Sequence, residues 1–162
     1  MKRAAAAEGY VRVRWHLEID AEGWPPVGSE GLWAEPLGDE TYRIDNIPWF
    51  ARGVASGDTV CARVSSDGVL WVTEHVRWSG NLTIRVIPLG HGPLAGDLER
   101  TRKELSGLGI ESEANQQHGI MSVNVEQAAD LAALKATLRR GEADGWWAYE
   151  EGCISDAWRA IA

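Results

Sequence analysis

The feature of this chain that most restricts its fold is a change in hydrophobic pattern at Ser79 and Gly80. Before this point, short runs of alternating apolar and polar residues are separated by turn-forming Gly, Asp, Asn and Pro residues, and no helical period is visible. After it, the alternating runs are interrupted by two segments with apolar residues at helical spacing. We therefore expect an α+β chain with an all-β first part and a mixed second part.

The first part has the pattern of a small antiparallel sheet. Residues 10–19 have a period of two, in which Val, Trp, Leu and Ile alternate with polar or amphipathic side chains, as in a strand with one buried face. Further strands are expected at 32–37, 41–44, 59–64 and 69–78. Short strands joined by tight turns predict a small β-barrel or a curled antiparallel sheet over residues 1–79.

The second part has a different order of elements. Strands are expected at 82–87, 110–116, 120–125 and 146–151, and helices at 97–108 and 126–140. Asp97 is a suitable N-cap for the first helix, and Gly109 and Gly141 are expected to end the two helices. The order βαββαβ predicts a ferredoxin-like unit over residues 80–155, followed by a C-terminal tail at 156–162.

The charge of the chain bears on its partners. The net charge is −8, and residues 1–80 and 81–162 each carry eight basic and twelve acidic side chains. Proteins that bind nucleic acid or anionic membranes show a concentration of Lys and Arg, because affinity comes from neutralising phosphates. We therefore expect neither nucleic acid nor a membrane surface as a partner.

Cysteine usage and the start of the chain bear on location and cofactors. Cys61 and Cys153 are far apart in the sequence, and no Cys/His cluster has the spacing of a zinc site, so we expect no metal and no cofactor. Only four alanines lie between Arg3 and Glu8, fewer than an export signal needs. No run approaches the roughly 20 apolar residues of a membrane helix. We expect a cytoplasmic protein with reduced thiols.

Common catalytic motifs are absent from the sequence. There is no nucleophile elbow, no phosphate-binding loop with Gly-Lys and no Gly-x-Gly-x-x-Gly fingerprint. The remaining weak catalytic candidates are Arg52, Asp58, His75 and Glu150. Neighbours on a strand point to opposite faces, so Glu74 cannot assist His75, and Glu150 and Glu151 cannot act as a pair. Arg52 and Asp58 are expected to form an ion pair across a loop.

Tryptophan is the conspicuous residue type, with nine Trp against one Phe. Trp combines a large apolar surface with an N–H donor, so several rings are expected to line a groove or a seam between layers. The ligand-binding candidates are Trp24, Trp33, Asp45, Asn46, Trp49, Phe50 and Trp147. For the loop around Asp45 and Asn46 we favour a structural corner of the barrel over a ligand pocket, because both side chains can bond local backbone.

Several of these segments resemble a known family. They are Gly31–Glu35, Tyr42–Phe50, Arg52–Ala55 with Gly57 and Asp58, and, more weakly, Trp24–Pro26 and Tyr149–Cys153. Together they are similar to the bacterial domain-of-unknown-function family numbered four-two-six-five. The likeness covers roughly residues 10–155 and implies no activity, substrate or cofactor.

Two classes of function follow from these observations. The first is a binding or regulatory module that holds a small hydrophobic molecule or a peptide in a Trp-lined groove. The second is a small cofactor-independent hydrolase or isomerase that uses Arg52, Asp58 or His75. Whether the chain is an enzyme at all, and whether it forms a homodimer, stays open. Two catalytic candidates within hydrogen-bond distance of each other would favour the enzyme.

Overall fold

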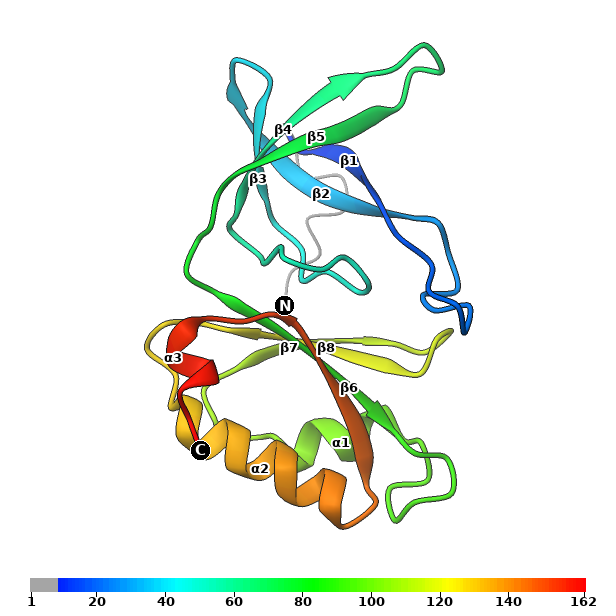
Figure 1. The fold of residues 1–162 in the computed structure, drawn as a ribbon, viewed down its shortest axis with the longest axis vertical. Coiled ribbons are helices and arrows are strands. Elements are labelled where there is room, and N and C mark those ends of the chain that lie inside the picture. The colour runs from blue at the N-terminus through cyan, green and yellow to red at the C-terminus, as the bar shows by residue number, and fades with distance from the viewer. Residues whose placement is uncertain (1–8) are drawn as a thin grey trace. The chain divides into compact units, whose positions relative to one another are not determined.

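Residues 9–162 are described in a computed structural model (Figure 1). The start of the chain, considered above as an export signal, lies outside these residues. The described chain divides into two compact units, one ending at Ser79 and the other beginning at Gly80. No helix within the described range is long and apolar enough to cross a membrane. The chain is mixed α+β, as its pattern predicted.

The first unit is a closed barrel, which decides between the two expected forms of its sheet (Figure 1). Its strands are β1 (Val11–His16), β2 (Ser29–Gly38), β3 (Thr41–Ile44), β4 (Thr59–Val64) and β5 (Leu70–Arg77). Consecutive strands pair antiparallel. The barrel closes where β1 pairs with β5 in parallel, with Arg14 opposite Trp71.

The barrel core follows from the alternation in the strands. Val13 of β1 and Leu32 and Ala34 of β2 point inward and are almost fully buried. The core also contains Ile44, Ala51, Val54, Val60 and Ala62. Strand β1 ends at His16, before the predicted residue 19, because the Asp20 carboxylate accepts the backbone N–H groups of Glu22 and Trp24 and turns the chain.

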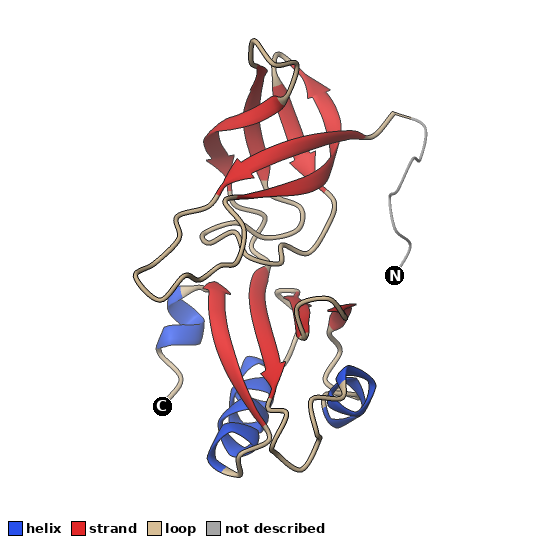
Figure 2. Ribbon diagram, turned by 90° about the vertical axis from the view of Figure 1, so that its right-hand side faces the viewer, coloured by secondary structure: helices blue, strands red, loops and turns tan. Residues whose placement is uncertain are grey.

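The second unit is a four-stranded sheet with helices on one face (Figure 2). Its elements are β6 (Leu82–Pro88), α1 (Leu98–Glu104), β7 (Glu111–Asn115), β8 (Ile120–Val125), α2 (Leu131–Ala143), β9 (Trp147–Cys153) and α3 (Asp156–Arg159). The strand order is β7-β8-β6-β9, and every neighbouring pair is antiparallel. Apolar residues of α1, α2 and the strands form one core.

Helix α2 differs from its prediction at both ends. It begins after Asp130 rather than at Glu126, because the Asp130 carboxylate accepts the N–H of Ala133 and so caps the helix. It also continues past Gly141 to Ala143. Gly141 lies inside the helix because the Trp147 ring occupies the space of a side chain there, with Cζ2 only 2.2 Å from an added Cβ.

Residues 156–162 were expected to be a tail, but they contain α3 and complete the core of the second unit. Trp158 is fully buried in that core, and its indole N–H donates to Glu151 at 2.7 Å. Lys135 of α2 is also buried and donates to the carbonyl oxygens of Trp158 and Ile161. The C-terminal segment is therefore held by both packing and hydrogen bonds.

Candidate functional site

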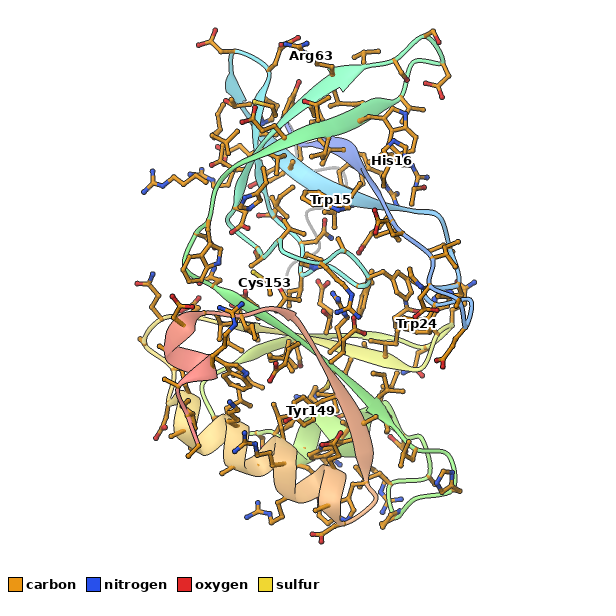
Figure 3. All side chains as sticks on the ribbon, viewed as in Figure 1. Trp15, His16, Trp24, Arg63, Tyr149 and Cys153 are labelled. Atoms are coloured by element: carbon orange, nitrogen blue, oxygen red, sulfur yellow. The ribbon has the colours of Figure 1, made fainter. Side chains whose placement is uncertain are left out.

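The outer side of β1 carries a row of cationic and imidazole side chains. Because side chains alternate along a strand, Val13 and Trp15 face the barrel core while Arg12, Arg14 and His16 face outward. Figure 3 labels Trp15 and His16, which extend from neighbouring positions of β1. Arg12 and His16 are exposed and Arg14 is half-buried. The row is thus accessible from solvent.

Strand β2 brings an indole ring beside this row. Arg12 is opposite Trp33, and the Arg12 guanidinium carbon lies 5.7 Å from the centre of the Trp33 ring. Gly31, next along the same face of β2, makes room for the Arg12 side chain, whose Nε lies 2.2 Å from the position of an added Cβ. The absence of a side chain at Gly31 therefore lets Arg12 lie across β2 and reach the ring of Trp33.

Strand β5 supplies a second indole on the other side of β1. The His16 and Trp71 rings are stacked, with centroids 3.9 Å apart and an angle of 5° between their planes. Arg14 is opposite Trp71 in the β1–β5 pairing, and its Nη1 donates to the Ser29 hydroxyl at 3.3 Å. Trp33 and Trp71 thus flank the row of Arg12, Arg14 and His16, and we call these five residues the Arg–Trp face.

Two of the carboxylates near this face, Glu35 and Glu40, are paired with arginines. Glu35, two residues from Trp33, contacts Arg43 at 2.5 Å, and the Glu35 carboxylate raises the pKa of Arg43. Glu40 contacts Arg63, which lies opposite Trp71 on β4, at 3.1 Å. Arg12 and Arg14 therefore give the Arg–Trp face two guanidinium groups on a chain whose net charge is −8. The face offers guanidinium groups to an acidic group and indole rings to a planar one.

The predicted candidates Trp33, Asp45 and Asn46 meet, but through the backbone. The Asn46 side-chain oxygen accepts the backbone N–H of Trp33, and the N–H of Asp45 donates to the Trp33 carbonyl at 2.8 Å. These contacts tie the loop between β3 and β4 to strand β2. They agree with the structural corner that the sequence favoured for this loop.

Glu30 is a residue that sequence reasoning missed. Its side chain is buried, and its carboxylate accepts the backbone N–H groups of Trp49, Phe50 and Ala51 at 2.5, 2.9 and 2.9 Å. A glutamate at an inward position of an alternating strand was the available signal, because a buried carboxylate requires several donors. Glu30 thus holds the middle of the loop between β3 and β4.

Two of the four catalytic candidates lie within hydrogen-bond distance of each other. Asp58 is fully buried, and its carboxylate accepts the backbone N–H groups of Ala55 and Ser79 at 3.0 and 2.8 Å. His75 places Nε2 at 2.7 Å from the same carboxylate, while 31% of its side chain is exposed. The Asp58 carboxylate, which the sequence suggested as a partner of Arg52, thus contacts His75.

The other candidates are distributed over both units. Trp24 and Phe50 meet edge to face in the barrel unit, with ring centroids 5.6 Å apart. Trp49 is half-buried. Glu150 belongs to the second unit, where it contacts the buried Arg85 at 3.0 Å. Trp147 is fully buried in the core of that unit and donates to the carbonyl of Leu138, so its ring is not on a surface.

No group of three or more His, Cys, Asp and Glu side chains among residues 9–162 has the arrangement of a metal site. Cys61 is half-buried and Cys153 is buried. Two arrangements of side chains are the candidates for function, the Arg–Trp face and the Asp58–His75 pair.

Comparison with known proteins gives a family and a fold. No curated protein matches the chain. A crystal structure of a hypothetical protein from Neisseria gonorrhoeae is similar, with a TM-score of 0.70 and 24% sequence identity over 91% of this chain and 95% of that chain. At this identity the likeness concerns the fold alone. Residues 30–149 match the family described as Domain of unknown function (DUF4265), and the chain therefore belongs to that family.

Proposed function

We propose that this protein is a ligand-binding module and that the Arg–Trp face of its barrel binds a molecule carrying both an acidic group and an aromatic ring. The observation that supports this most directly is the interleaving of Arg12, Arg14 and His16 with Trp33 and Trp71 on one accessible face. The proposal keeps the binding role expected from the sequence and assigns it to a surface within one unit.

The chemistry of the face favours such a ligand. A guanidinium forms charge-assisted, often bidentate, hydrogen bonds with a carboxylate or phosphate. An indole ring offers a flat apolar surface for a second ring, and a cation over an aromatic face adds attraction. Arg12 and His16 already lie against Trp33 and Trp71, so both rings are held in place before a ligand arrives.

The test is a titration of the intrinsic tryptophan fluorescence with benzoate, indole-3-acetate, adenosine monophosphate and inorganic phosphate. We expect the ring-bearing acids to change the emission at lower concentration than inorganic phosphate. Gly31→Ala is the diagnostic variant, because an added Cβ displaces the flexible Arg12 side chain rather than the backbone. It should weaken binding while circular dichroism stays unchanged.

Gly28→Ala serves as the matched control, because an added Cβ there meets nothing within 4 Å. It should bind the ring-bearing acids as the parent protein does. Equal responses of the Gly31→Ala variant and the parent protein, or no response to any of the four compounds, would count against the proposed site.

A second candidate function is a cofactor-independent hydrolase or isomerase, and the Asp58–His75 pair supports it. A buried carboxylate at 2.7 Å from one ring nitrogen orients an imidazole, whose other nitrogen then serves as a general base. An assay with activated esters would test it. His75→Gln should abolish any turnover and Asp58→Asn should reduce it at least tenfold, and turnover that both variants retain would exclude the pair.

We also infer that the second unit is ferredoxin-like. The strand order β7-β8-β6-β9 with all neighbours antiparallel, and the presence of α1 and α2 in one core with the sheet, support this arrangement. The inference concerns the fold and carries no function, because folds of this kind host many unrelated activities.

A further inference from the structure

We infer that the physiological ligand of the Arg–Trp face is a short stretch of single-stranded nucleic acid, an inference that rests on the binding role proposed above. It names the ligand class for that site and goes beyond a small aromatic acid. The same surface would then contact the phosphodiester backbone with its cations and the bases with its rings.

The first argument is the linear arrangement of the cationic groups. Arg12, Arg14 and His16 occupy alternate positions of one strand, so successive side chains leave β1 about 7 Å apart in a straight row. A single-stranded polyanion also presents its charges as a row at regular intervals. A compact ligand with one acidic group, by contrast, needs only one of these three side chains.

The second argument is the position of the two indoles. Strand β1 lies between β2 and β5 in the barrel, so Trp33 borders the row on one side and Trp71 on the other. Proteins that bind single strands without sequence preference combine a cationic track with aromatic side chains on which successive bases stack. Trp71 with His16 already forms such a parallel stack, and a base extends it by one layer.

The rings also favour nucleic acid over an acidic peptide as the partner. Aspartate and glutamate side chains satisfy the two guanidinium groups equally well, but they add no ring to the stack of His16 on Trp71 or beside Trp33. Every base has a flat π-face, so a single strand uses all five residues of the Arg–Trp face. A nucleic-acid ligand therefore accounts for the two indole rings as well as for the two guanidinium groups.

The net charge of −8 by itself argues against a nucleic-acid partner. The net charge of the whole chain does not show that strand alternation places Arg12 and Arg14 on one face. It also does not show that Glu35 and Glu40 are paired with other arginines. The acidic remainder of the molecule still repels a polyanion at long range. Binding should thus be weak, measurable at low salt, and limited to a few nucleotides.

The experiment is fluorescence anisotropy with a labelled oligothymidylate of about ten nucleotides, long enough for one small barrel. Two phosphate contacts give a slope of about −1.4 for the logarithm of the association constant against that of salt, so raising salt from about 50 to about 200 mM should weaken binding roughly sevenfold. The double variant R12Q/R14Q should lose at least tenfold in affinity at the lower salt, with a slope near zero.

The matched control is R100Q/K103Q, which removes the same charge from two exposed residues of helix α1. It should bind the oligonucleotide within twofold of the parent protein. Circular dichroism of both double variants shows whether each is folded. Because Arg14 is half-buried, R12Q alone serves as the variant if the double variant is unfolded. It should lower the salt slope by about half.

Two further probes separate this inference from the proposed function. Thymidine monophosphate bound as tightly as the oligonucleotide would overturn the inference and leave the binding of small ring-bearing acids intact. A glutamate peptide of equal length bound as tightly would overturn it in favour of an acidic protein segment. No binding of any probe would contradict both the inference and the proposed function. An equal loss of affinity for the oligonucleotide in both double variants would mean that the contact does not lie on the Arg–Trp face.

Discussion

At the scale of single residues, three glycines are explained by large side chains that lie over them. Arg12 covers Gly31, the Trp147 ring covers Gly141, and the Arg85 guanidinium covers Gly152 at 2.7 Å from an added Cβ. Gly152 thereby makes room for the buried Arg85, which contacts Glu150. In each case a missing side chain on one element permits a long side chain from another to lie across its backbone.

Gly141→Ala tests this relation between helix α2 and Trp147. Alanine favours a helix over glycine by up to about 1 kcal/mol. That gain is smaller than the cost of overpacking, about 1–3 kcal/mol, because the added Cβ falls 2.2 Å from a rigid and fully buried indole. Urea unfolding should therefore show a net loss of about 1 kcal/mol.

The control is Gly90→Ala, in the same unit, where an added Cβ meets nothing within 4 Å. It should change the free energy of unfolding by less than about 0.5 kcal/mol. A Gly141→Ala variant as stable as the parent protein would mean that the Trp147 ring does not rest on the helix backbone.

At the scale of elements, the loop between β3 and β4 is ordered by acidic and amide side chains. Glu30 accepts three backbone N–H groups, Asp58 accepts two, and Asn46 binds the backbone of Trp33. The donors of Trp49, Phe50, Ala51 and Ala55 belong to this loop, and an irregular segment would otherwise leave such groups without partners. The family signature is dense in this region, and its residues Asn46 and Asp58 have a structural role here.

Glu30→Gln should destabilise the barrel unit. The amide has a single oxygen, so it can accept from Phe50 and Ala51 but no longer from Trp49 at the same time. A buried donor without a partner costs about 1–3 kcal/mol, and we expect a loss of that size in urea unfolding.

The control for Glu30→Gln is Glu35→Gln, which breaks only the half-exposed contact with Arg43. Pairs of this kind contribute at most about 1 kcal/mol. If the two variants lose the same stability, Glu30 does not order the loop.

Lys135→Met should release the C-terminal helix α3. Methionine keeps the apolar stem and removes the ammonium that binds the carbonyls of Trp158 and Ile161. Amide hydrogen exchange at residues 158–161 should accelerate by about tenfold. This factor corresponds to the loss of the free energy that roughly one hydrogen bond contributes.

Lys103→Met, at an exposed position of helix α1, is the corresponding control and should leave exchange in α3 unchanged. Unaltered exchange in the Lys135→Met variant would show that the packing of Trp158 alone holds the segment.

Helix α2 and the C-terminal segment show where sequence patterns succeed and fail. Strands β3, β4 and β8 were predicted with the ends that they have, because alternation and flanking turn residues agree there. The ends of α2 were missed because Asp130 is a better cap than Glu126, and because a glycine that stops most helices is here accommodated under Trp147. The residues of α3 are too few to show a helical period.

At the scale of the whole molecule, the sequence indicated an α+β chain with a barrel-like first part, and the structure bears this out. The candidate site was less predictable. Arg12, Arg14 and His16 are visible in the sequence as one face of a strand, but Trp33 and Trp71 join them only through the pairing of β1 with β2 and β5. Pairing between segments far apart in the chain depends on the closure of the barrel, which local patterns do not specify.

The central claim, that ligand binding occurs on the Arg–Trp face, is tested most directly by following the nine indole N–H resonances during a titration with a short oligothymidylate. Assignment uses single Trp→Phe variants. The account predicts that the Trp33 and Trp71 signals shift together in proportion to occupancy, while the signals of the buried Trp147 and Trp158 stay in place. Shifts confined to other indoles, with Trp33 and Trp71 unmoved at saturation, would contradict it.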